Sequence, residues 1–74
     1  MTTDKVEKLR AILFSALIKV KEKHKDVIKS DIKYCVVVEP DGKLVTADWL
    51  NDHPEIIKDI QEQYDIALMV AESL

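Results

Sequence analysis

The placement of the residues that break regular secondary structure divides this chain into three segments. Its only glycine is Gly42, and its only prolines are Pro40 and Pro54. The run from Pro40 to Gly42 has the composition of a tight turn, because proline presets φ and glycine accepts a positive φ. Pro54 has the position that proline prefers in the first turn of a helix. Two long segments therefore flank a short one that reverses direction.

The opening segment predicts one long helix from Asp4 to about Ser30. Asp4 and Glu7 have capping-box spacing, with Thr3 as an alternative cap. Apolar residues and one histidine recur at helical spacing and predict the buried stripe: Val6, Leu9, Leu13, Leu17, Val20, His24, Val27 and Ile28.

A second apolar row lies on another side of the same predicted helix. Ala11, Phe14 and Ile18 are spaced i, i+3 and i+7, roughly 100° or more from the main stripe. A helix that is apolar on two sides is normally buried on two sides. We therefore expect a partner surface along this row, unless the other helix covers it.

The middle segment predicts a β-hairpin. Residues 32–39 are rich in β-branched and aromatic side chains, and residues 43–49 form the answering strand. A three-residue loop pairs Val37 with Val45 and Val38 with Leu44. One face is then predicted to hold Ile32, Tyr34, Val36, Val38 and Leu44. The other is predicted to hold Cys35, Val37, Val45, Ala47 and Trp49.

Both predicted faces of the hairpin are therefore apolar. A hairpin with one face in water should alternate apolar and polar residues, and a two-stranded sheet is barely stable alone. We expect the hairpin to gain cover from a second copy of the chain. Together with the first helix it supplies a candidate interface that consists of Ala11, Phe14, Ile18, Tyr34, Val36, Val38 and Trp49.

The closing segment predicts a second helix from Pro54 to Glu72, with Asp52 and Glu55 in capping-box spacing. In an alternative, residues 66–71 form a short third strand. The predicted architecture is one small α+β domain, residues 1–74, in the order helix, hairpin, helix (αββα), with αββαβ as the alternative.

The size of the chain favours association. A domain this short buries only about 60% of its unfolded surface, and small domains usually rely on disulfides, a metal or oligomerisation. Cys35 is the only cysteine, and His24 and His53 lie far from it in sequence without metal-ligand spacing. We expect no metal, no cofactor and no catalytic residues, and a homodimer.

Charge and composition restrict the partners. Residues 1–33 carry nine basic and five acidic side chains (+4), and residues 34–74 carry two basic and nine acidic ones (−7), which together give −3. An acidic chain with few aromatic residues is a poor candidate for nucleic-acid binding. No apolar run is long enough to span a membrane, and the N-terminus does not resemble a secretion signal, so we expect a cytoplasmic protein.

Three functional hypotheses follow. The first is a non-enzymatic protein–protein interaction module, homodimeric through the hairpin and first helix. The second is an acidic regulatory inhibitor or decoy that docks on a basic groove of another protein through Asp52, Glu55, Asp59 and Glu62. The third is a small enzyme or ligand-binding protein assembled across a dimer interface. Its polar groups would be Tyr34, Cys35, His24 and His53.

Overall fold

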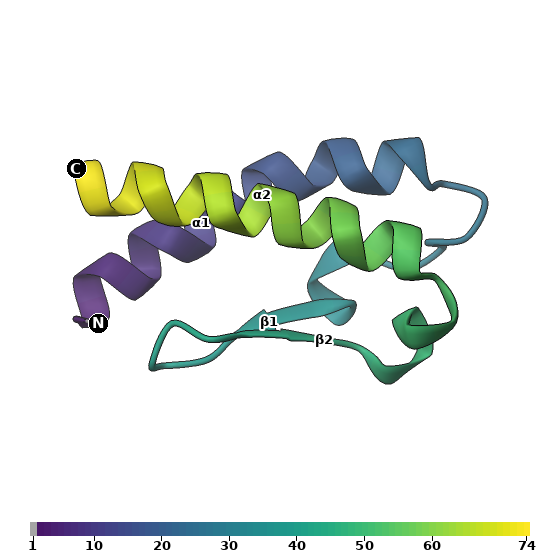
Figure 1. The fold of residues 1–74 in the computed structure, drawn as a ribbon, viewed down its shortest axis with the longest axis horizontal. Coiled ribbons are helices and arrows are strands. Elements are labelled where there is room, and N and C mark those ends of the chain that lie inside the picture. The colour runs from purple at the N-terminus through teal and green to yellow at the C-terminus, as the bar shows by residue number, and fades with distance from the viewer. Residues whose placement is uncertain (1) are drawn as a thin grey trace.

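The structure is a computed structural model, and it describes residues 2–74. Two helices, α1 (Thr3–Lys23) and α2 (Pro54–Ser73), run antiparallel and form one layer. A two-stranded antiparallel hairpin, β1 (Val36–Val38) and β2 (Leu44–Thr46), forms the other layer and lies on one side of both helices (Figure 1). The predicted α+β helix–hairpin–helix fold is confirmed.

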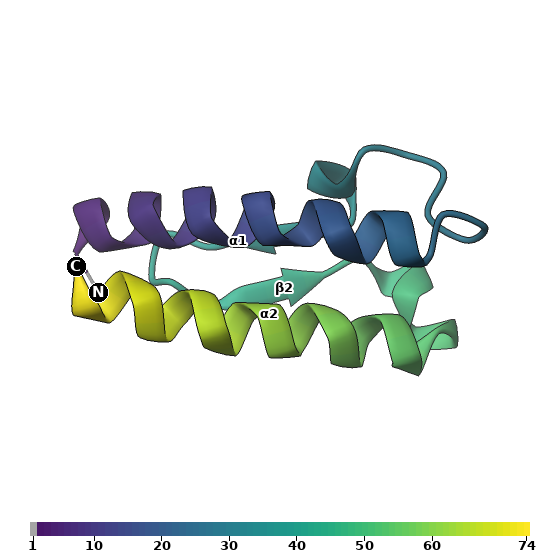
Figure 2. The same ribbon diagram turned by 90° about the horizontal axis from the view of Figure 1, so that it is seen from above.

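Both helices follow the predicted apolar periodicity. Helix α2 continues through residues 66–71, so the alternative third strand is wrong. The caps differ from the predicted ones: Thr2 precedes α1 and its hydroxyl accepts from the Lys5 amide at 3.3 Å, while the residue before α2 is His53, without a side-chain cap. Seen from above, α1 lies over β1 and α2 over β2 (Figure 2).

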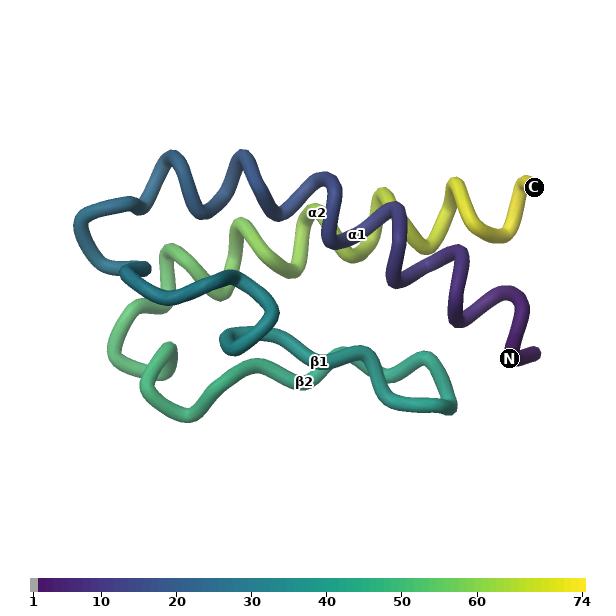
Figure 3. Tube along the Cα trace, turned by 180° about the vertical axis from the view of Figure 1, so that it is seen from behind, coloured from purple at the N-terminus to yellow at the C-terminus, as the bar shows by residue number. Residues whose placement is uncertain are grey.

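Helix α1 ends seven residues earlier than predicted. His24 closes it, and the backbone amides of Val27 and Ile28 both donate to the His24 carbonyl in a turn. From behind, the chain turns back at this point and runs down to the hairpin (Figure 3). A helix continued to Ser30 would extend roughly 10 Å beyond the end of the helix pair. The turn instead places Ile28 in the core.

The hairpin has the predicted register but shorter strands. Val37 pairs with Val45 and Val38 with Leu44. The predicted strand positions 32–34 form the 3-10 helix η1 (Ile32–Tyr34), because the Asp31 carboxylate accepts from the Lys33 amide at 3.1 Å. After β2, Asp48 and Trp49, which were predicted as the end of the strand, instead begin a second 3-10 helix, η2 (Asp48–Asp52).

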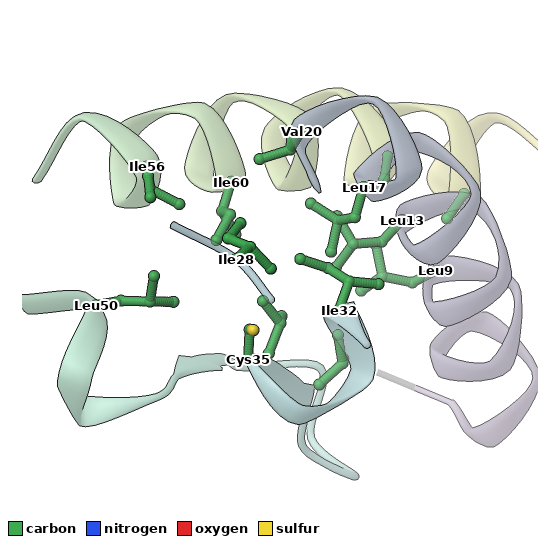
Figure 4. Close-up of a cluster of buried hydrophobic side chains, with 14 of the residues drawn as sticks. Leu9, Leu13, Leu17, Val20, Ile28, Ile32, Cys35, Leu50, Ile56 and Ile60 are labelled. Carbon is green, nitrogen blue, oxygen red and sulfur yellow. The ribbon is translucent and has the colours of Figure 1, made fainter. Parts of the chain in front are cut away.

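The core lies between the helix layer and the hairpin. Leucines from one face of α1 meet isoleucines of α2, while Ile28, Ile32, Cys35 and Leu50 enter from the connections and the hairpin (Figure 4). Each of these side chains is buried. Residues outside the two long helices and the two strands therefore complete the core.

Candidate interaction surfaces

One of the two predicted apolar faces of the hairpin is buried in the structure, and the other is exposed. Val36 and Val38 point toward the helices and are 1% and 2% exposed, whereas Val37 and Val45 are 55% and 41% exposed. Val36 and Val38 were predicted as interface residues, and the structure places them in the core of a single copy. The valines of the hairpin that remain exposed, and could contact another molecule, are Val37 and Val45.

A shallow apolar hollow of about 120 Å³ lies on the uncovered side of the hairpin. Besides the half-buried Thr46, the exposed or half-buried residues that line it are apolar or aromatic, and we call these four the outer face: Tyr34, Val37, Val45 and Ala47. Tyr34 reaches this side because η1 interrupts the two-residue alternation of the strand, which also turns Cys35 into the core. The Lys33 ammonium lies 5.3 Å from the Tyr34 ring.

The remaining predicted interface residues lie on other parts of the surface. On α1, Ala11 is exposed, Ile18 is 62% exposed, and Phe14 is half-buried against the core. The row that they form is therefore only partly open. Trp49 lies on η2, where its ring contacts His53 edge-on with centroids 6.1 Å apart.

The predicted acidic docking face is partly occupied within the molecule. The Asp59 carboxylate lies 2.6 Å from His24 Nε2 and 3.0 Å from the Lys23 ammonium, and these contacts join the end of α1 to α2. The hydrogen bond with His24, and then that with Lys23, lowers the pKa of Asp59. Of the other three acidic residues, Glu62 borders a groove with Lys19 and Lys23, while Asp52 and Glu55 are exposed.

This groove between the helices also shows where the two charged halves of the sequence meet. It has a volume of about 190 Å³ and is lined by the basic side of α1 and the acidic side of α2: Lys19, Val20, Lys23, Asp59, Glu62 and Gln63. Because the helices are antiparallel, part of the positive charge of residues 1–33 lies beside part of the negative charge of residues 34–74. The charge asymmetry is therefore partly balanced inside one copy.

The polar residues of the enzymatic hypothesis are dispersed. Cys35 is buried, with its sulfur 4.0 Å from Ser30 Oγ. His24 pairs with Asp59, whereas His53 lies at the start of α2, 3.7 Å from Glu55. Tyr34 and Cys35 both line the hollow on the outer face, but neither histidine does. In residues 2–74 no three or more His, Cys, Asp or Glu side chains gather as metal ligands would.

Two contacts that the sequence did not predict hold the hairpin to the helices. Arg10 of α1 donates to the Val38 carbonyl through Nε at 3.0 Å and Nη2 at 2.6 Å. The Tyr64 hydroxyl of α2 donates to the Gly42 carbonyl at 2.6 Å. Tyr64 is the only hydroxyl-bearing residue in the apolar pattern of the second helix, and this signal could have indicated a polar partner; nothing in the sequence marked Arg10.

Comparison with protein-family models, with curated proteins and with solved structures returned no match for this chain. No helix within residues 2–74 is long and apolar enough to cross a membrane. The surface of the molecule is therefore the basis for the functional inference.

Proposed function

We propose that this chain is a non-enzymatic protein–protein interaction module that forms a homodimer through the outer face of its hairpin. The observation that carries the proposal is the pair Val37 and Val45. They lie directly opposite each other in the sheet, are exposed to about half their area, and alternate with the buried Val36 and Val38, so they lie on the face of the hairpin away from the core. Burial of such a pair gives a favourable free energy of association.

A second copy suits the outer face because the face has few polar groups that would need specific partners. Tyr34, Val37, Val45 and Ala47 present mainly hydrocarbon around the hollow. Two copies can meet across a two-fold axis, so that the outer face of one copy contacts the outer face of the other. The side chains nearest the hollow, such as Tyr34, would then fill the hollow of the facing copy. The contact is small, so we expect a weak dimer.

The proposal moves the contact away from two of the predicted interface residues, Val36 and Val38, because they are already buried. Ala11, Phe14 and Ile18 lie in the helix layer rather than on the outer face, so they form at most an edge of the contact. The cytoplasmic location remains part of the proposal and rests on the cysteine usage, because small secreted domains are usually rich in disulfides and this chain has one cysteine.

The oligomeric state in solution tests the proposal. Light scattering coupled to size-exclusion chromatography, over low to high micromolar concentrations, should give a mass that rises toward twice that of the 8.5 kDa chain. Val45→Glu should shift this equilibrium at least about tenfold toward monomer, since it places a charge in the apolar contact. A wild-type chain that stays monomeric throughout the range contradicts the proposal.

Met69→Glu is the matched control. Met69 is also an exposed apolar residue, but it lies on α2, and glutamate is a good helix former. The control adds the same charge and should leave the dimer intact. If both variants dissociate it equally, net charge rather than the outer face controls association. Ile18→Asp reports whether the contact extends to α1.

A further inference from the structure

The hydrogen bonds of the hairpin identify which backbone groups point away from it. The Ala47 amide donates to the Cys35 carbonyl at 2.8 Å. The Glu39 amide donates to the Lys43 carbonyl at 2.9 Å. In an antiparallel ladder, hydrogen-bonded pairs alternate with pairs whose amides and carbonyls point outward, to the two edges of the sheet. Counting from these bonds along the register gives the pairs that point outward: Val36 with Thr46, and Val38 with Leu44.

The two edges of the sheet differ in what covers them. At the edge of β1, Arg10 occupies the Val38 carbonyl with two hydrogen bonds, and η1 packs against both α1 and β1 with Ile32 in the core. At the edge of β2, no hydrogen bond within residues 2–74 reaches the outward amide or carbonyl of Leu44 or Thr46. We call these outward groups the β2 edge. An unpaired strand edge is a template for another strand.

The helix layer is wider than the sheet that it covers. Two packed helices have axes about 8–10 Å apart, whereas neighbouring strands lie about 4.8 Å apart. Since α1 lies over β1 and α2 lies over β2 (Figure 2), each helix extends sideways beyond its strand. On the β1 side, η1 fills the space beside the strand. A third strand at the β2 edge would fill the corresponding space under α2.

The flank of α2 above the β2 edge carries apolar side chains that are incompletely covered. The Tyr64 hydroxyl donates to the Gly42 carbonyl next to β2, which marks the side of the helix that faces this edge. Leu68 lies one turn further along the same flank. Both side chains pack against the core but are only half-buried, whereas Ile60 and Ala67 are fully buried. The core is therefore less complete on the β2 side of α2.

We propose that the β2 edge binds an extended segment of another protein, which joins the hairpin as a third strand. Backbone groups of the segment pair with those of Leu44 and Thr46, as in other cases of strand addition. Every second side chain of the segment then faces α2 and contacts Tyr64 and Leu68, so these side chains should be apolar. The proposal goes beyond the homodimer and does not depend on it, because the outer face and the β2 edge are different sides of the sheet.

A second copy of the chain does not fit the β2 edge, because its own helix is in the way. The β2 strands of two copies paired antiparallel about a two-fold axis would lie about 4.8 Å apart. The α2 helices of both copies would lie on the same side of the combined sheet, each over its own β2. Helix axes pack no closer than about 8 Å, so the two helices would collide. An extended segment without a helix above it avoids this collision.

A synthetic peptide tests the β2 edge without a natural partner. The probe has roughly eight residues and alternates valine and threonine between terminal lysines. The comparison peptide is N-methylated at its valines, whose amides would pair with β2 when their side chains face α2. In a heteronuclear NMR titration, the amide signals of Leu44 and Thr46 should shift saturably, and the comparison peptide should bind at least about tenfold more weakly. Equal binding of the two peptides, or binding of neither, would overturn the proposal.

Variants of the full chain locate the binding. Thr46→Pro removes an outward amide without removing a bond of the ladder, so the chain should still fold and bind the probe at least about tenfold more weakly. Leu68→Ala should weaken binding about threefold or more, because it removes apolar contact with the added strand. Met69→Ala is the matched control, since Met69 is exposed on another side of α2, and should leave the affinity unchanged. Should Thr46→Pro fail to fold, Leu68→Ala against Met69→Ala decides; equal affinities of these two variants would refute the site.

Light scattering separates this proposal from the homodimer. Thr46→Pro keeps the side chains of the outer face and should leave the mass of the chain without peptide unchanged. A fall in that mass would show that a second copy occupies the β2 edge, and the extended-segment proposal would be wrong. If Val45→Glu leaves the mass unchanged, the proposed dimer contact is wrong, while the peptide titration still decides the β2 edge.

Discussion

The two faces of the hairpin are built from the same residue type and have opposite environments. Val36 and Val38 are almost completely buried, whereas Val37 and Val45 are exposed to about half their area. Hydrophobicity alone does not choose between these faces, since valine occupies both. The difference must come from what else joins the hairpin to the helices.

Polar contacts supply that difference. On the inner side, Arg10 donates twice to the Val38 carbonyl, and Tyr64 donates to the carbonyl of Gly42. Gly42 has a φ of 91°, which a residue with a side chain adopts only at a cost. Helix α1 thus contacts the hairpin through Arg10, and helix α2 contacts it through Tyr64. We infer that these two contacts orient the hairpin with Val36 and Val38 toward the helices. The outer face has no comparable contact within the described residues, which leaves it available for another molecule.

Truncation of one valine on each face should give the largest contrast in stability. Val38→Ala removes two buried methyl groups and should lower the free energy of unfolding by about 2 kcal/mol. Val37→Ala should change it by less than about 0.5 kcal/mol at concentrations where the chain is monomeric. Urea denaturation followed by circular dichroism measures both. Equal losses of unfolding free energy in the two variants would contradict the burial of Val38 and the exposure of Val37.

Much of the fold follows from local signals in the sequence. The turn at Pro40–Gly42, the register of Val37 with Val45 and the start of α2 at Pro54 all depend on backbone chemistry at single positions. The core stripes of both helices follow from apolar spacing. These features need no information about distant parts of the chain, so the sequence predicted them.

The features that were missed depend on contacts between distant residues or on a local cap that competes with the strand. No glycine or proline marks the end of α1 at Lys23, where His24 pairs with Asp59, 35 positions later. The strand at residues 32–34 had the right composition, but a cap from Asp31 forms η1 and turns Tyr34 outward.

Removal of the Arg10 side-chain contact tests whether polar contacts orient the hairpin. Arg10→Met keeps most of the aliphatic stem and loses both hydrogen bonds to the Val38 carbonyl. We expect the free energy of unfolding to fall by about 1 kcal/mol, because the site is partly open and water replaces part of the interaction. Amide hydrogen exchange should rise in β1 more than in α2. Unchanged exchange in β1 would show that apolar packing alone holds the hairpin.

Acidification should affect the helix pair more than the attachment of the hairpin, because the contacts of Arg10 and Tyr64 with the hairpin involve no carboxylate. Asp59 has a pKa below its ordinary value of 3.8, so its ionised form is stabilised in the folded chain. That stabilisation is complete above the pKa of the unfolded chain and is lost as pH falls through the lowered folded value. The difference in unfolding free energy between wild type and Asp59→Asn should therefore shrink between about pH 5 and pH 2.5. The difference between Val38→Ala and Val37→Ala should stay constant over the same range. A difference between wild type and Asp59→Asn that stays constant with pH would show that the ionised Asp59 does not stabilise the contact between α1 and α2. A shrinking difference between the two valine variants would show that a carboxylate contributes to the attachment of the hairpin.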